Sequence, residues 1–298
     1  MAKQIRVIAR LDIKGPNLIK GLQFDGYRVL GTAEQFARLY YTEGADELIY
    51  QDAVASLYRR NSLLDIIERT AREIFIPLTV AGGIRSIENI RTILRAGADK
   101  VAINTAAVEN PQLLKEASKI FGSQCIVSSI EVFRKESGQF QVWVDYGREV
   151  TPLDALEWAK QVVDLGVGEI LLTSINQEGM GTGYDLDLIH KISSIVPVPV
   201  VACGGAGCKE DFSRAVLEGG ADAVAASSIF HYNYSKPFNR PFMSFAEARL
   251  RMGEHVDSGN IDFLNHGYGG QRAINVAPTS IHDVKMDMVK KGIPVRIK

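Results

Sequence analysis

The chain has 298 residues, of which 46% are apolar, so it has enough material for one large core. Its formal net charge is −1 and charges of both signs are mixed along it, which argues against nucleic acid or an anionic membrane as a partner. Three cysteines show neither a disulfide framework nor zinc-ligand spacing, and no apolar run reaches the ~18 residues that span a bilayer. We therefore expect a cytoplasmic protein without a bound metal.

Eight short runs rich in Val, Ile and Leu recur along the chain, most of them separated by stretches of helical periodicity. Strands that alternate with helices form a parallel sheet, and eight such units in a chain of this length fit a closed (β/α)8 TIM barrel. We expect a single α/β domain over residues 1–298. The expected strands are Arg6–Leu11, Glu47–Gln51, Pro77–Val80, Asp99–Ile103, Cys125–Ile130, Glu169–Thr173, Pro199–Ala202 and Ala223–Ala226.

The chain also repeats itself. AGGIRSIENI at 81–90 returns as CGGAGCKEDF at 203–212, and GADKVAINTAA at 97–107 returns as GADAVAASSIF at 220–230. Asp12 and Glu131, which follow the first and fifth expected strands, are separated by nearly the same interval, about 120 residues. This self-similarity indicates two half-barrels in which the two acids hold equivalent positions.

The two acids are the candidate catalytic pair. Catalytic groups of a TIM barrel lie at the carboxyl ends of the strands, where Asp12 and Glu131 are expected to face one another across the barrel mouth. Two positioned carboxylates supply a general acid and a general base if their surroundings separate their pKa values. Such chemistry requires no cofactor.

Four charged residues lie near the amino ends of the expected strands, at the opposite end of the barrel. If they face inward, they form a ring of two cations and two anions at the barrel floor. The ring has two interpretations: a self-neutralised structural salt-bridge network, or a polar gate through which a small molecule enters from below. Its members are Arg6, Glu47, Lys100 and Glu169.

The segment 14–36 after the first strand is long for a connection in a barrel and contains several glycines. Long polar loops over a barrel mouth often act as lids. Lys20 is the residue in it best suited to touch an anionic substrate, and the alternative is a solvated surface lysine.

Glycine-bearing turns follow two pairs of expected strands. Glycine lets backbone N–H groups approach an anion, and a phosphate site after strands seven and eight is common in TIM barrels. The internal repeat places a second such site opposite. We therefore predict two phosphate sites on one elongated substrate, formed by Gly82, Gly83, Asn104 and Thr105 on one side and by Gly204, Gly205, Gly207 and Ser227 on the other.

Several segments resemble the HisF family, the cyclase subunit of imidazole glycerol phosphate synthase. The similarity covers about residues 4–231 and the final GIPVR, and the motifs that carry it are LDIKGPNLIKG, GADELIYQD, ADKVAINTAAVENP, FGSQCIVSSIE, GEILLTSINQEG and VACGGAG. The resemblance implies an ammonia-dependent reaction on a bisphosphorylated formimino-aminoimidazole carboxamide ribonucleotide, in which two carboxylates act as acid and base.

The resemblance also implies a partner. Ammonia is expected from a HisH-like glutaminase subunit docked at the amino-terminal face of the barrel, and this favours the gate interpretation of the ring. It further implies phosphate contacts at the glycine turns, and substrate contacts at Thr173, Glu178 and Gly179, at and after the sixth strand.

The chain departs from the family pattern at several of these positions. Glu131 stands where the family usually has Asp, and Arg10 replaces a small residue one layer beneath Asp12. Our hypothesis for Arg10 is that it pairs with Asp12 or Glu131 and holds that carboxylate ionised. Such changes argue that the substrate has changed while the ammonia-handling floor was kept.

The largest departure follows the last strand. Residues 232–279 form an insertion that we expect on the catalytic face, with a helix over Ser244–His255. His231, His255 and His266 lack metal-ligand spacing and are expected at the surface or at an interface, and HGYGG at 266–270 is interpreted as a turn.

Three functions remain open at this point. The first is the cyclase reaction of histidine biosynthesis. The second is a HisF-like paralogue that uses glutaminase-derived ammonia to install an amidine or amino group on a nucleotide-linked sugar. The third is a scaffold that binds a phosphorylated ligand without turnover, against which the two opposed carboxylates argue.

Overall fold

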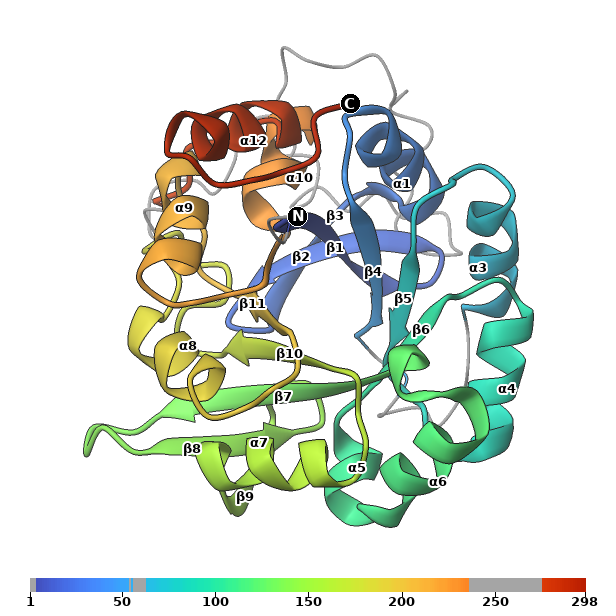
Figure 1. The fold of residues 1–298 in the computed structure, drawn as a ribbon. Helices are drawn as coiled ribbons and strands as arrows, with labels where there is room; N and C mark the ends of the chain where they lie inside the picture. Colours follow the sequence, from blue (N-terminus) through green and yellow to red (C-terminus); the bar gives the residue numbers. More distant parts are fainter. Residues whose placement is uncertain (1–3, 54, 56–62, 236–274) are drawn as a thin grey trace.

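A computed structural model describes residues 4–53, 55, 63–235 and 275–298 of the protein. Eight parallel strands close into a barrel, with β10 pairing with β7 to complete the circle (Figure 1). The TIM barrel predicted from the sequence is thus confirmed, with strand ends shifted by a few residues. Its strands are β1 (Arg6–Lys14), β4 (Glu47–Asp52), β5 (Leu78–Ala81), β6 (Lys100–Ile103), β7 (Ile126–Arg134), β10 (Glu169–Ser174), β11 (Val200–Cys203) and β12 (Ala223–Ala226).

Helices surround the barrel (Figure 1). They begin where the sequence supplies caps: the Ser86 hydroxyl accepts from Asn89 N–H before α4, and Asp154 accepts from two N–H groups at the start of α7. The helical elements are α1 (Ala33–Thr42), α3 (Leu64–Ala71), α4 (Ile87–Arg95), α5 (Thr105–Glu109), α6 (Gln112–Phe121), the short 3-10 helix η1 (Ser123–Cys125), α7 (Ala155–Asp164), α8 (Leu186–Ser193), α9 (Lys209–Leu217), α10 (Ser228–Ser235) and α12 (Ile281–Lys290). None of these is long and apolar enough to cross a membrane.

The core has two parts because strand side chains alternate between faces. Residues such as Val7 and Leu11 point outward and pack with the helices in the main cluster. Ile8, Ile49 and Leu171 point inward and fill the middle of the barrel together with small residues. The same alternation directs Arg6, Arg10 and Asp12 of β1 toward the barrel axis.

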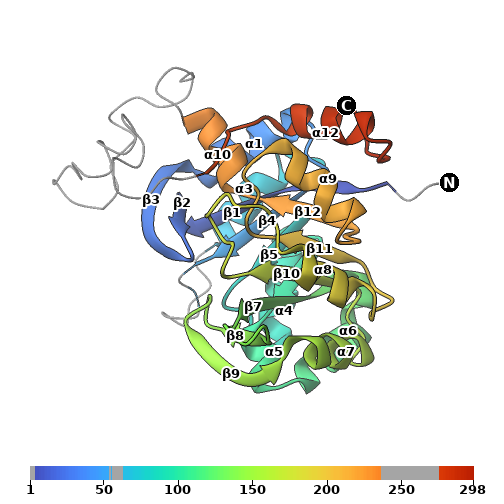
Figure 2. The same ribbon diagram turned by 90° about the vertical axis from the view of Figure 1, so that its left-hand side faces the viewer.

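Two β-hairpins extend the half-barrel repeat beyond the barrel itself. β2 (Asn17–Leu22) and β3 (Asp25–Thr32) follow β1, and β8 (Phe140–Val144) and β9 (Glu149–Asp154) follow β7 at the equivalent place. Figure 2 shows both hairpins at one end of the barrel, with the start of β1 at the other. The segment 14–36 is therefore mostly a hairpin rather than an irregular loop, since its buried Leu18, Ile19 and Leu30 anchor paired strands.

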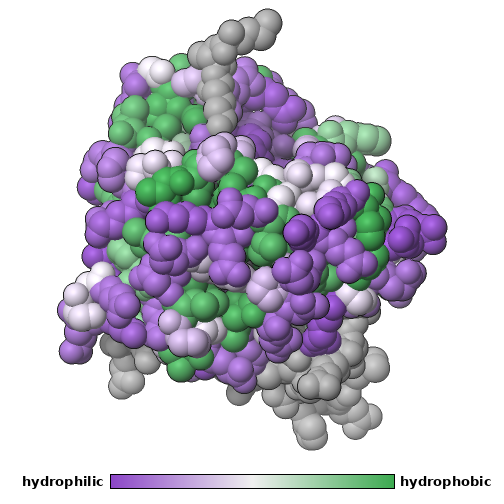
Figure 3. All heavy atoms as spheres, turned by 60° about the horizontal axis from the view of Figure 1, so that its bottom comes forward, coloured by the Kyte–Doolittle hydropathy of each residue, from purple (hydrophilic) through white to green (hydrophobic). Residues whose placement is uncertain are grey.

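The outer surface agrees with the mixed charge of the sequence. Figure 3 shows one face as a mosaic of hydrophilic and hydrophobic patches. The exposed large apolar side chains, such as Phe75, Val150 and Leu217, come from different parts of the chain.

Of the expected insertion 232–279, the described residues are limited to its two ends. Residues 232–235 continue helix α10, so the helix that follows the last barrel strand runs into the expected insertion. The predicted helix Ser244–His255, His255, His266 and the HGYGG turn lie outside the described residues.

Candidate active site

Asp12 and Glu131 lie at the same end of the barrel, on strands β1 and β7. Their neighbours in register are Gln51 on β4 and Thr173 on β10. Both carboxylates are almost completely buried, with 2% and 3% of their surface exposed. The hairpins that follow β1 and β7 cover this end of the barrel, so the two acids occupy a site shielded from bulk water.

Asp12 is held by two cations. Arg10 Nε lies 3.0 Å from Asp12 Oδ1, and Lys20 Nζ lies 3.2 Å from Oδ2. Burial alone would raise the pKa of Asp12, but the charges of Arg10 and Lys20 outweigh it and hold this pKa below its ordinary value. The hypothesis that Arg10 pairs with an acid and keeps it ionised is confirmed for Asp12.

Glu131 has the opposite electrostatic environment. Among the described residues, only the Gly147 N–H donates a hydrogen bond to its carboxylate, to Oε2 at 2.8 Å. Burial raises the pKa of Glu131 to about 7, although Arg10 and the Gly147 N–H oppose the shift. At neutral pH Asp12 is therefore ionised, whereas Glu131 is poised to give or take a proton.

Lys20 is not a solvated surface residue. It lies on β2 with only 2% of its surface exposed, and its ammonium group contacts Glu178 as well as Asp12. Burial would lower the pKa of Lys20, but Glu178 and Asp12 raise it, so the side chain stays charged. Hairpin pairing explains the position, because alternation along β2 turns Lys20 toward the barrel mouth.

The first glycine turn lines a small cavity of about 40 Å³ next to Glu131. Gly82 and Gly83 have φ values of 98° and 72°, and a Cβ on Gly82 would lie 2.4 Å from the Asp52 carbonyl oxygen. Asn104 and Thr105 line the same cavity, together with Gln51 and Ser129. The four residues predicted for the first phosphate site therefore lie together.

The second glycine turn lines a cavity across the mouth. Gly204, Gly205 and Ser227 contribute to it, as do Glu178 and Gly179. The Gly207 N–H instead donates to Asp211 Oδ2 at 2.9 Å. The Thr173 hydroxyl lies 3.5 Å from Arg10 Nη1. Gly207 and Thr173 are therefore two predicted residues that do not line this cavity.

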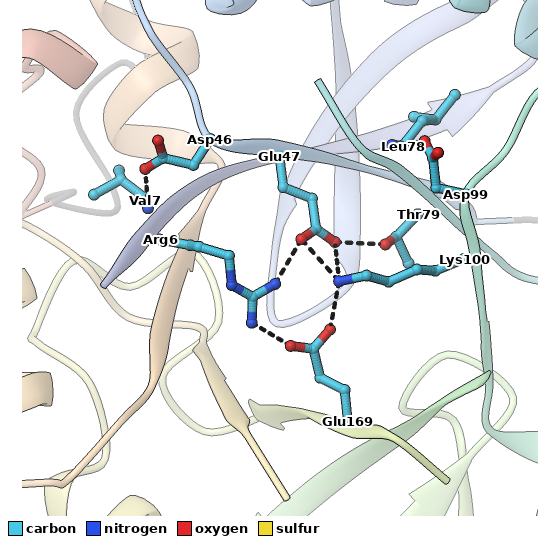
Figure 4. Close-up of polar contacts among 9 residues, drawn as sticks. All are labelled: Arg6, Val7, Asp46, Glu47, Leu78, Thr79, Asp99, Lys100 and Glu169. Carbon is cyan, nitrogen blue, oxygen red and sulfur yellow. Dashed lines mark hydrogen bonds and ion pairs between the residues drawn. The ribbon is translucent and has the colours of Figure 1, made fainter. Parts of the chain in front are cut away.

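The ring at the barrel floor is closed (Figure 4). Arg6 contacts Glu47 at 2.6 Å and also contacts Glu169, while Lys100 lies 3.0 Å from Glu47 and 2.8 Å from Glu169. Thr79 Oγ1 donates to Glu47 at 2.6 Å. Each carboxylate thus contacts both cations, as the sequence predicted.

A model of the histidine biosynthesis protein family matches residues 6–236. The imidazole glycerol phosphate synthase subunit HisF of Legionella pneumophila is 54% identical over 209 residues, which cover 70% of this chain and 99% of the relative. The subunits of the same name from Alkaliphilus metalliredigens and Methanocaldococcus jannaschii are 46% and 48% identical, each over 76% of this chain and 90% of the relative. The chain belongs to the HisF family.

The residues that match the family model contain every part of the candidate site described above: both carboxylates, both glycine-lined cavities and the floor ring. Within the described part of the chain, no group of three or more His, Cys, Asp and Glu side chains could hold a metal ion. The relatives are named as subunits, so each of them belongs to an assembly.

The turn between β8 and β9 belongs to the site but was not predicted from the sequence. Its Tyr146 packs on Phe24 of the other hairpin, with ring centroids 4.3 Å apart, and its Gly147 donates to Glu131. The signal was present: the alternating FQVWV of residues 140–144 followed by a glycine is typical of a hairpin. The two hairpins of this HisF chain therefore meet over the two acids.

His231 is not a surface residue, contrary to expectation. It is fully buried on α10, with Nδ1 2.5 Å from the Tyr40 hydroxyl. Burial lowers the pKa of His231 to about 3, so it stays neutral. The helix that follows the last barrel strand packs against α1, which turns a polar side chain into the core.

Proposed function

We propose that this chain is the cyclase subunit of imidazole glycerol phosphate synthase. The reaction consumes ammonia and converts a bisphosphorylated formimino-aminoimidazole carboxamide ribonucleotide to imidazole glycerol phosphate and an aminoimidazole carboxamide ribotide. The observation that carries this proposal is the pair of buried, opposed carboxylates with unequal proton affinities. Membership in the HisF family supports it.

In this proposal the substrate spans the barrel mouth, with one phosphate at each glycine turn. Ammonia adds to the ketose carbon, water leaves, and an amidine C–N bond is then cleaved. Asp12 is ionised and takes protons from the attacking nitrogen, while Glu131, whose pKa is about 7, donates protons to leaving groups. The hairpins exclude water that would compete with ammonia.

We assign the remaining residues by their positions. Gly82, Gly83, Asn104 and Thr105 receive one phosphate, and Gly204, Gly205 and Ser227 receive the other. The Gly207 N–H, which donates to Asp211, orders this turn instead. Glu178 and Gly179 lie at the second cavity, where the carboxylate suits a sugar hydroxyl better than a phosphate. Lys20 and Thr173 complete the site beside Asp12.

Ammonia is proposed to arrive from a glutaminase partner at the amino-terminal face, beneath the ring of Arg6, Glu47, Lys100 and Glu169. The ring lies at the axis and is partly open to that face, since Arg6 and Lys100 keep 28% and 18% of their side-chain surface exposed. A small neutral molecule could pass if one ion pair opens.

The test is turnover of the ribonucleotide by the purified chain at pH 8 with high ammonium, which bypasses the glutaminase. Rates in the ordinary enzyme range of about 1–10³ per second support the proposal. An intact, folded chain that leaves the ribonucleotide unchanged contradicts it.

One observation favours a second candidate. Arg10 is buried in the site beside Asp12, at a position where the resemblance implied a small residue. A changed residue next to the reacting groups fits a different substrate, such as a nucleotide-linked sugar that receives an amidine or amino group. Incorporation of labelled ammonium into a panel of sugar nucleotides, without turnover of the ribonucleotide, selects this candidate.

A further inference from the structure

Among the described residues, Arg10 is the one charged side chain with a buried nitrogen that has no hydrogen-bond partner. Its side chain is 1% exposed. Nε donates to Asp12 at 3.0 Å, and Nη1 lies 3.4 Å from Cys203 Sγ. Nη2 is buried and has no hydrogen-bond partner among the described residues.

An unpaired buried donor on a charged group is costly, so such groups are rare unless a ligand completes them. The guanidinium is held in place by more than Asp12. Its Cζ lies 5.5 Å from the Phe24 ring and 5.9 Å from the Tyr146 ring, one from each hairpin. The free donor is therefore held at a fixed position in a buried site.

Neighbours of the Arg10 guanidinium line both cavities. Cys203, which Nη1 contacts, lines the cavity of the second glycine turn. Tyr146, which lies beside the guanidinium, lines the cavity of the first. A substrate with one end in each cavity would cross the Arg10 side chain at its middle.

We propose that Arg10 is a catalytic residue whose Nη2 donates a hydrogen bond to the central carbonyl oxygen of the substrate, at the carbon that ammonia attacks. This inference rests on the proposed function. The nitrogen lone pair forms the new C–N bond while the carbonyl π pair moves onto oxygen. Asp12 removes one proton from the nitrogen, and the alkoxide bound to Arg10 receives a proton from Glu131 to give the carbinolamine.

Other cations near the site are less suited to this role. Lys20 is engaged by both Asp12 and Glu178. Arg6 and Lys100 lie at the opposite end of the barrel in a closed ring. A planar guanidinium can bind Asp12 through one edge and an oxygen through another, which an ammonium point charge does with less directional control.

The test compares kcat and KM of the wild type with those of three variants at pH 8 and saturating ammonium. Arg10→Met keeps the volume, Arg10→Lys keeps the charge, and Arg10→Ala leaves room for free guanidinium. The control is Arg91→Met, because Arg91 also stacks on a ring, 5.5 Å from the centroid of Phe121, but lies partly exposed on α4.

We expect kcat to fall by about a hundredfold to a thousandfold in all three Arg10 variants, as for loss of one oxyanion donor, with KM changed much less. Low, non-denaturing guanidinium should restore part of the Arg10→Ala rate and none of the Met rate. At pH 8 Asp12 stays ionised even without Arg10, since Lys20 remains, so loss of support for Asp12 alone would not produce this fall.

Two results overturn the inference while leaving the proposed function intact. One is an active wild type with Arg10→Met within about threefold of it. The other is a rate loss in Arg10→Met that disappears as pH rises, which would make Arg10 only a positioning residue for Asp12. An inactive wild type overturns the proposed function, and this role of Arg10 with it.

Discussion

The barrel contains two clusters of charged side chains, one at each end, and they differ in how completely their charges are paired. At the floor, Glu47 and Glu169 each contact both Arg6 and Lys100, so two cations balance two anions. At the mouth, Asp12 takes two cations, whereas Glu131 makes no ion pair with any described residue.

The difference separates a stable network from a reactive one. A closed ring satisfies its charges, because each carboxylate contacts both cations. The mouth leaves Glu131 with a pKa of about 7 and Arg10 with an unpaired N–H, both of which a substrate can use. The same residue types therefore serve different purposes at the two ends.

The largest expected effect comes from a substitution in the charge cluster at the barrel mouth. Asp12→Asn removes the proposed base but keeps the shape, so kcat should fall by about a thousandfold while the substrate dissociation constant changes little. Steady-state kinetics and calorimetric titration measure the two. Asp65→Asn, at an exposed position on α3, is the control and should leave both unchanged. A normal kcat in Asp12→Asn refutes the assignment of the base.

A substitution in the charged ring at the barrel floor should lower the stability of the fold. Glu47→Gln leaves Arg6 and Lys100 with only Glu169 between them, and we expect the free energy of unfolding to fall by about 2–3 kcal/mol, less than for fully buried pairs because both cations are partly exposed. Denaturant unfolding measures it. The control Glu73→Gln breaks an exposed pair with Arg38 and should shift the curve within error. Equal shifts in the two variants would show that the ring contributes nothing.

The comparison is sharpened by the pH dependence of stability. The pKa of Glu131 is raised from 4.5 to about 7 in the folded protein, so ionisation costs more there than in the unfolded chain. Wild-type stability should therefore decline between pH 4.5 and 7. Glu131→Gln should match the wild type near pH 4 and exceed it by roughly 1–3 kcal/mol at pH 8. Parallel stability curves across this range would show that Glu131 titrates normally.

The smallest expected effect concerns the hairpin that covers the mouth. The Tyr146 hydroxyl helps to lower the pKa of Asp12, after the larger influences of burial, Arg10 and Lys20. Tyr146→Phe should move the acidic limb of the kcat/KM profile upward by a few tenths of a pH unit. Tyr27→Phe is the matched control, because the Tyr27 hydroxyl donates to the Phe24 carbonyl instead. A shift of equal size in both variants would assign the effect to the hairpin as a whole.

Much of the fold and of the charged ring at the barrel floor could be predicted from the sequence. Both depend on the alternation of side chains along strands and on the interval of the internal repeat. Alternation along β1 turned Arg6, Arg10 and Asp12 inward, and the repeat interval set Glu131 opposite Asp12. The glycine turns were predicted from the same internal repeat. What escaped prediction depended on contacts between distant segments, such as Tyr146 on Phe24 and His231 against Tyr40.

Lys20 shows the limit clearly. Its sequence neighbours suggested a loop. Its ammonium group nevertheless contacts Asp12, eight residues away, and Glu178, 158 residues away. The sequence alone thus determined the barrel, its two halves, the placement of the acids and the members of the ring, since these follow from local periodicity. Only the tertiary structure decided which carboxylate stays ionised and which titrates near neutrality, because the residues that bury and pair the two acids lie on separate strands.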